Sequence, residues 1–274
     1  MQKIMVVVLL GMVLALTGCS LNKPAPKPEP PKVQEGVTLN GTAIGNLSLT
    51  ELEALLAKTA AESYIAPINA GFDENGGISQ SRKGRRLNTG AVIAQVMSAP
   101  PYSHISSVYQ DILPYITTES LNAANKAGSY TTPILDGQPN RMHNIKLTAK
   151  LINNSVIDSG SEFSFNKVSG EPTAERGFKE ATVFADDGRH EQGIGGGMCQ
   201  VSSTLYNAAL AMGLIITERH PHSQPVDYVP PNRDATTYTD KDLRFINNTR
   251  QTLIIRAFVS GKELTVDLFA LPPQ

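Results

Sequence analysis

The spacing of apolar positions predicts two amphipathic helices in the second half of the chain. Apolar residues recur on one face of Asn140–Asn153 and again from Val201 to Met212, after which Gly213 is a typical helix stop. Short apolar runs of strand type occur at Glu162–Phe165, Thr182–Ala185, Leu214–Glu218, Val226–Val229, Leu243–Ile246, Leu253–Val259 and Leu264–Phe269. We therefore predict a mixed α+β domain over residues 128–274 with a mainly antiparallel C-terminal sheet.

A smaller set of patterns predicts a second α+β module over residues 36–127. Asn40-Gly41 stands between short apolar runs, as in a tight β-hairpin. Ser48 or Thr50 then begins a helical pattern, in which Thr50 and Glu53 fit a capping box. The other elements that we expect are strands at Ile68–Asp73 and Ile78–Arg82 and a helix at Thr89–Met97.

Residues 1–19 have the pattern of an export signal. Lys3 precedes an apolar run, Ile4 to Leu16, that is shorter than the about 20 residues of a transmembrane helix. A charged start, a short apolar run and small residues before a cleavage site are typical of a signal peptide. The tetrapeptide that ends at Cys19, Leu-Thr-Gly-Cys, resembles the lipobox of bacterial lipoproteins, which implies lipidation of Cys19. An uncleaved N-terminal anchor is the alternative.

Residues 20–35 are rich in proline. The stretch LNKPAPKPEPPK alternates Pro with Lys or Glu, which favours an extended, solvated polyproline conformation of roughly 3 Å per residue. We expect a linker that holds the folded part away from a membrane. Recognition of the prolines by a partner protein is the alternative.

Charge and cysteine content narrow the function classes. The chain has 24 basic and 25 acidic residues, a formal net charge of −1, so no basic surface for nucleic acid is expected. It has 2 cysteines. If Cys19 carries a lipid, Cys199 has no disulfide partner in its own chain, and it is an intermolecular bridge, an inert buried thiol or a reactive one.

Cys199 falls between a glycine run and a predicted helix. A helix N-terminus favours the thiolate and so lowers the pKa of a cysteine. Glycines allow backbone N–H groups to approach a substrate carbonyl as an oxyanion hole, while the first helical turns carry further hydrogen-bonding groups. A tight turn beside a buried thiol is the structural alternative. The candidate substrate-binding residues here are Gly195, Gly196, Gly197, Gln200, Ser202 and Ser203.

A nucleophilic cysteine needs a base, and a His-Pro-His sequence follows downstream. Pro221 disfavours a helical conformation at His220, and in an extended segment His220 and His222 point to the same side. Either can take the thiol proton, and Asp227 or Asp234 can orient the imidazole. Arg219 and Arg233, with Arg176, are candidates to bind a substrate carboxylate.

Zinc is the competing chemistry for the same residues. Cys199, His220 and His222, with Glu218 or His190, offer the sulfur and nitrogen ligands that zinc accepts. The glycines before Cys199 favour a nucleophile that contacts substrate over a coordination loop. We therefore expect no metal and no cofactor.

Six segments stand in order along the second half of the chain: EFSFN (Glu162–Asn166), ERGF (Glu175–Phe178), GGGMCQVSSTLYNAAL (Gly195–Leu210), ERHPHSQPVDYVP (Glu218–Pro230), RDAT (Arg233–Thr236) and DLRFINNT (Asp242–Thr249). Together they resemble the VanW domain family, with the match running from about Tyr130 to Phe269. The departure from the family pattern is Pro231-Asn232, where a Gly often precedes the Arg-Asp-Ala-Thr block. The resemblance also implies a peptidoglycan-binding role for the preceding module, whose alternative is a plain structural spacer.

The resemblance implies work on the bacterial cell wall. Some members are regarded as L,D-transpeptidases, which implies a nucleophile at Cys199 and a base at His222 or His220. The implied reaction cleaves the bond between meso-diaminopimelate and a terminal D-Ala of a stem peptide, forms a thioester and makes a 3-3 cross-link. The alternative is a non-catalytic peptidoglycan-binding accessory protein. In both cases we expect a lipid-anchored protein outside the cytoplasmic membrane, with peptidoglycan stem peptides as its partners.

Overall fold

The computed structural model describes residues 30–74, 76–184 and 190–273. The predicted signal peptide, Cys19 and the first part of the predicted linker lie outside the described residues. The described chain forms two compact units, residues 30–56 with 90–107, and residues 57–89 with 108–273. The predicted domain boundary between residues 127 and 128 stays a prediction. No described helix is long and apolar enough to cross a membrane.

The first unit contains the predicted hairpin. Strands β1 (Thr38–Leu39) and β2 (Thr42–Ala43) pair antiparallel, and β6 (His104–Ile105) pairs parallel with β1. Asn40 and Gly41 have φ values of 49° and 84°, the left-handed conformation that such a turn requires. The Asn-Gly hairpin is thus confirmed.

Helix α1 (Leu49–Ser63) begins one residue earlier than the capping box that the sequence predicts. The Ser48 N–H and hydroxyl donate to Glu51 Oε2 at 2.8 and 2.7 Å, and the Glu51 N–H donates to Ser48 Oγ at 3.3 Å. The prediction that Thr50 and Glu53 form the capping box is therefore wrong. Ser48 and Glu51, two residues upstream, have an equivalent Ser-x-x-Glu pattern and make the capping hydrogen bonds. Helix α2 (Thr89–Ser98) confirms the helix predicted at Thr89–Met97.

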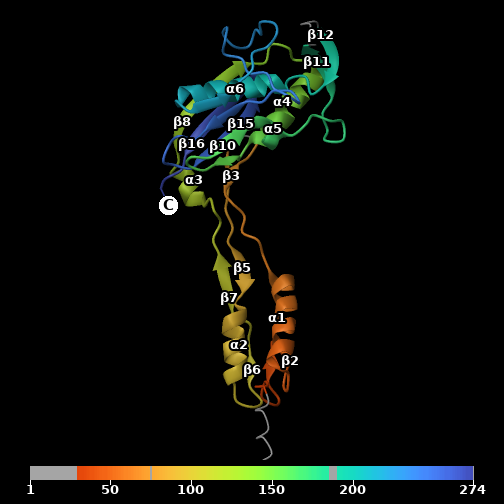
Figure 1. Cartoon of the computed structure of the whole chain (residues 1–274), viewed down its shortest axis with the longest axis vertical. Helices are drawn as coiled ribbons and strands as arrows, with labels where there is room; N and C mark the ends of the chain where they lie inside the picture. The colour runs from red at the N-terminus through yellow and green to blue at the C-terminus, as the bar shows by residue number, and fades with distance from the viewer. Residues whose placement is uncertain (1–29, 75, 185–189, 274) are drawn as a thin grey trace, which may run out of the picture. The chain divides into compact units, whose positions relative to one another are not determined.

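The second unit is built on a four-stranded antiparallel sheet (Figure 1). Its order is β8 (Asn125–Pro133), β16 (Glu263–Ala270), β15 (Leu253–Ser260) and β9 (Val156–Ile157). Helix α6 (Met198–Ala211) packs against β8 and β16, while α4 (Pro139–Ile152) packs against β15 and α6. The α+β class and the mainly antiparallel C-terminal sheet are thereby confirmed.

A second sheet, also antiparallel, has the order β10 (Glu162–Ser164), β14 (Arg244–Ile246) and β13 (Ile215–Glu218). The predicted strand at Val226–Val229 is wrong, because no regular structure forms there. Pro225, Pro230 and Pro231 surround that segment and cannot donate to a strand ladder. The remaining elements are β3 (Gly71–Phe72), β4 (Ile78–Ser79), β5 (Gly84–Leu87), β7 (Tyr109–Ile112), α3 (Thr118–Asn122), α5 (Phe165–Ser169), β11 (Glu180–Phe184) and β12 (His190–Ile194).

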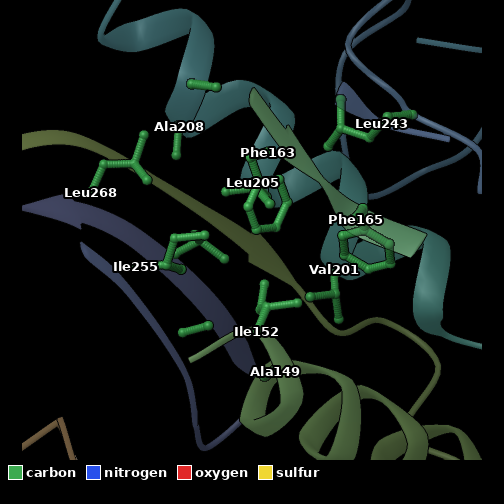
Figure 2. Packing of buried hydrophobic residues seen from close by; sticks show 14 of the residues in the cluster. Ala149, Ile152, Phe163, Phe165, Val201, Leu205, Ala208, Leu243, Ile255 and Leu268 are labelled. Carbon is green, nitrogen blue, oxygen red and sulfur yellow. The ribbon is translucent and has the colours of Figure 1, made fainter. Parts of the chain in front are cut away.

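The hydrophobic core of this unit fixes the position of α6. Figure 2 shows side chains from α6, including Val201 and Leu205, directed toward those of α4 and the sheet, and both are fully buried. The rings of Phe163 and Phe245 stack with centroids 5.0 Å apart. Full burial of each such side chain stabilises the fold by about 1.5–3 kcal/mol. The N-terminus of α6, which carries Cys199, is therefore held on a rigid support.

Candidate active site

The glycine run makes the sharp connection from β12 to α6. Gly195 and Gly197 have φ values of 90° and 112°, and Gly197 is the N-cap of α6. A Cβ on Gly196 would lie 2.6 Å from the Thr182 carbonyl oxygen, and one on Gly197 would lie 2.8 Å from Ile145 Cγ1. Side chains are excluded at these positions by backbone conformation and by close packing. The turn places Cys199 in the first turn of α6.

Three of the four predicted catalytic residues come together around the sulfur. The His222 ring lies close enough to the Cys199 thiol for each group to shift the pKa of the other, and Cys199 Sγ donates to the Thr237 carbonyl oxygen at 3.6 Å. His222 Nδ1 lies 2.7 Å from Asp234 Oδ2, and the His222 backbone N–H donates to the same oxygen at 2.6 Å. Because Nδ1 faces the carboxylate, Nε2 remains for the thiol. The arrangement is the chain of nucleophile, base and orienting acid that covalent catalysis uses.

The electrostatics of the triad favour the charged pair of thiolate and imidazolium. Burial alone would raise the pKa of the Cys199 thiol, but the hydrogen bond and charge of His222, with Thr237, lower it below its ordinary value. Burial alone would lower the pKa of His222, but Cys199 and then Asp234 raise it. The pKa of Asp234 is lowered, since the His222 hydrogen bonds outweigh burial. Cys199 as a whole is half-buried, and it lines two cavities of the site.

Arg219 and the two predicted serines hold the segment that carries Asp234. Arg219 donates to the Asp234 carbonyl oxygen and to Oδ1, each at 2.7 Å. Ser203 Oγ donates to the Cys199 carbonyl at 2.7 Å and accepts the Ala235 N–H at 2.8 Å, and Ser202 Oγ donates to the Ala235 carbonyl at 2.5 Å. Both serines are fully buried. The side chains of Arg219, Ser202 and Ser203, which the sequence suggested as substrate ligands, thus form hydrogen bonds to other residues of the protein.

The other predicted site residues lie in different environments. His220 Nε2 is 2.9 Å from Glu218 Oε1, so its ring is paired away from the triad. The Gln200 side chain is buried and donates to the Pro133 carbonyl at 2.9 Å. The Arg233 side chain is exposed, whereas Arg176 donates to two backbone carbonyls, those of Ser169 and Glu171, at 2.6 Å each.

Two cavities share Cys199 and His222 in their linings. One has a volume of about 320 Å³ and is lined by Cys199, His222 and Lys241 among others. The other, of about 80 Å³, is lined by Cys199 and His222 together with the glycine run. A third cavity of about 300 Å³ shares Met198, Thr237 and Tyr238 with the first. Substrate-binding clefts usually have volumes of about 300–1,000 Å³, so the larger cavities suit an extended ligand.

Two residues of this site escaped the sequence analysis. Arg141, in the first turn of α4, and Tyr228 both line the small cavity. Burial, and after it the charge of Cys199, raises the pKa of the Tyr228 hydroxyl, so this group stays protonated. Tyr228 lies in the ERHPHSQPVDYVP motif. That motif identified the segment as important but did not single out Tyr228. Arg141 stands in no motif that we recognised.

Zinc was the competing interpretation of these residues, and the described part of the chain contains no set of ligands for it. No group of three or more His, Cys, Asp or Glu side chains there has the arrangement to hold a metal ion. His220 pairs with Glu218, while His222 pairs with Cys199 and Asp234. The side chain of His190 lies outside the described set.

The fold and the site define an α+β protein in which a cysteine and a histidine line a cleft and the histidine is hydrogen bonded to an aspartate. Comparison with known proteins assigns the family. The family model described as "VanW like protein" matches residues 140–269. The Uncharacterized protein YoaR of Bacillus subtilis (strain 168) is 36% identical over 219 residues, covering 76% of this chain and 70% of that protein. This chain belongs to the VanW-like family.

A second relative connects the family to antibiotic resistance by name. The Vancomycin B-type resistance protein VanW of Enterococcus faecalis (strain ATCC 700802 / V583) is 29% identical over 140 residues, which cover 48% of this chain and 50% of that protein. No solved structure matches this chain. The family resemblance expected from the sequence motifs is confirmed.

Proposed function

We propose that this protein is a cysteine-dependent L,D-transpeptidase that acts on peptidoglycan stem peptides. The observation that carries the proposal is that Cys199 and His222 line two cavities together, while the His222 ring is hydrogen bonded to Asp234 and its charge lowers the pKa of the thiol. A lone buried thiol would have no need of a histidine oriented by a carboxylate. Membership of a family with a relative named for vancomycin resistance supports the cell wall as the place of action.

In the first half-reaction the Cys199 thiolate attacks the carbonyl carbon of the donor's scissile amide. The tetrahedral intermediate places negative charge on the former carbonyl oxygen. Met198 and Gln200 donate their N–H groups to the Gly195 and Gly197 carbonyls, each at 3.1 Å. Within the described contacts the Cys199 N–H has no such partner, so it is available to stabilise that charge.

His222 then protonates the leaving amine, the C–N bond breaks and a thioester remains on Cys199. In the second half-reaction an amine from a neighbouring stem attacks the thioester carbonyl. The new amide forms, His222 accepts the amine proton, and the sulfur departs as thiolate. A thioester suits this exchange because an amine attacks it readily, so the product is a cross-link.

The proposal is tested by mass spectrometry of the detergent-solubilised full chain after incubation with a tetrapeptide-stem fragment. We expect an acyl adduct on Cys199 that lacks the terminal residue, and a cross-linked product when a second stem is added. Cys199→Ala should give neither, with unchanged thermal melting. Stem binding by both proteins, with no adduct and no product, would instead support a non-catalytic accessory role.

We also propose that the protein is tethered to the outer face of the cytoplasmic membrane. Support comes from the sequence of residues 1–35, with its apolar run, Cys19 and proline-rich stretch. Metabolic labelling with a radioactive fatty acid should mark the wild-type chain and leave Cys19→Ser unlabelled. Equal labelling of both chains would contradict the anchor.

A further inference from the structure

Arg141 is a cationic side chain in the small cavity beside the nucleophile. That cavity is lined by Arg141, Cys199, His222 and Tyr228, among others. Arg141 Nη2 donates to Gln200 Oε1 at 3.1 Å, while its Nε is buried and has no partner among the described residues. A buried guanidinium donor without a partner is unusual and indicates that something else accepts its hydrogen bond.

The guanidinium is held in place by groups that are themselves fixed. Gln200 is buried, and its amide nitrogen donates to the Pro133 carbonyl at 2.9 Å and to Thr132 Oγ1 at 3.2 Å. This orients Gln200 Oε1 toward Arg141. Gly197 packs close to the Arg141 backbone, because a Cβ on residue 197 would lie only 3.2 Å from the Arg141 carbonyl oxygen. The charge is therefore positioned before any ligand arrives.

The size and lining of the cavity restrict what it can hold. Its volume is about 80 Å³, against about 320 Å³ for the neighbouring cavity that also reaches Cys199. None of its lining residues is acidic. Ordinary ligand sites start at about 300 Å³, so this one suits a group of a few heavy atoms. The planar fork of a guanidinium matches a carboxylate.

We propose that this cavity is the subsite for the leaving residue of the donor, a small amino acid whose free α-carboxylate binds Arg141. This inference rests on the proposed function, in which Cys199 is the nucleophile. The Cys199 sulfur forms a bond to the donor carbonyl carbon, and the C–N bond to the leaving residue breaks. His222 donates a proton to the departing amine, whose carboxylate stays on Arg141. Donors are then selected for a free C-terminal end.

Two donors that differ at one group test the subsite. The first is a tetrapeptide-stem fragment with a free terminal carboxylate, and the second is the same fragment with a terminal carboxamide. We expect the full chain to acylate Cys199 about 10- to 100-fold faster with the acid. In Arg141→Met the rate with the acid should fall to that with the amide, and the rate with the amide should hardly change. Arg141→Lys, which keeps the charge, should be intermediate. Arg250→Met, a change of an exposed arginine elsewhere, is the matched control.

A third donor separates failure of the subsite from failure of the proposed function. It is an aryl thioester of the same stem, which has no leaving amino acid. If it acylates Cys199 while the acid-to-amide ratio is the same in wild type and Arg141→Met, the subsite is overturned and the nucleophile stands. If no donor acylates Cys199, both are overturned. Should Arg141→Met melt at a much lower temperature than wild type, the ratio measured with Arg141→Lys decides.

Discussion

Arg219 donates hydrogen bonds to two oxygens of Asp234, the side-chain Oδ1 and the backbone carbonyl oxygen, at 2.7 Å each. The other carboxylate oxygen, Oδ2, faces His222. Arg219 also lies over the ring of Tyr206, with its guanidinium carbon 5.6 Å from the ring centroid. The arginine that the sequence offered as a substrate ligand is, in the structure, a positioning residue for the acid of the triad.

Replacing Arg219 should impair catalysis without removing a reacting group. Arg219→Ala frees the Asp234 carboxylate, so His222 loses part of its orientation. We expect kcat/KM to fall roughly 10- to 100-fold, a part of the about 10²–10⁴ that a positioned base contributes, mostly through kcat. Because Asp234 helps to raise the pKa of His222, the alkaline limb of the pH profile should move to lower pH. An unchanged profile would contradict this role.

The two histidines should differ sharply when each is replaced by glutamine. His222→Gln removes the ring that lowers the pKa of the Cys199 thiol and should lower the acylation rate by at least about 10². His220→Gln changes a ring that is paired with Glu218, and we expect a rate within a few-fold of wild type. Single-turnover acylation followed by mass spectrometry measures both. Equal losses would mean that both rings serve the reaction.

The pH dependence of alkylation should report the ionisation of Cys199. His222 lowers the pKa of the thiol, so the rate with iodoacetamide should rise with pH and reach its midpoint below that of an ordinary cysteine. In His222→Ala the effect of burial remains and the opposing charge of the ring is gone, so the midpoint should move to higher pH than in the wild type. Coincident midpoints in the two proteins would show that the ring does not influence the sulfur.

The glycine turn should be far less tolerant than a glycine at an open helix end. Gly197→Ala combines a left-handed φ, which costs about 1–2 kcal/mol, with a clash against Ile145 that costs about 1–3 kcal/mol. Gly213→Ala has the left-handed φ of 72° and nothing within 4 Å, so we expect only the first cost. Urea unfolding measures both free energies. A similar loss in the two variants would show that the packing is loose.

Periodicity was sufficient for the elements that carry the site. The apolar stripes of Asn140–Asn153 and Val201–Met212 predicted α4 and α6, because both helices bury one face against the sheet. The failure came at Val226–Val229, where Tyr228 and Val229 are buried without a strand. Tyr228 lines a cavity with Cys199 rather than one face of a sheet, and an apolar pattern does not separate the two cases.

The local sequence identified the candidate residues of the triad, but it did not show which of the two histidines belongs to it. The His-Pro-His motif left both rings open, since only the fold shows that Asp234 lies beside His222 and that Glu218 takes His220. Arg141 was out of reach for another reason. It enters the site through the packing of α4 against α6, a long-range contact that no local pattern records.

The double contact of Ser203 gives the site a built-in reporter. One hydroxyl joins the Cys199 carbonyl to the Ala235 N–H, so the turn bearing the sulfur and the segment bearing the acid cannot separate without freeing that amide. Deuterium uptake at Ala235 therefore follows the assembly of the reaction centre directly, in the resting protein and with no donor present. Slow uptake would mean that the catalytic arrangement persists between turnovers, whereas fast uptake would mean that it forms anew each time.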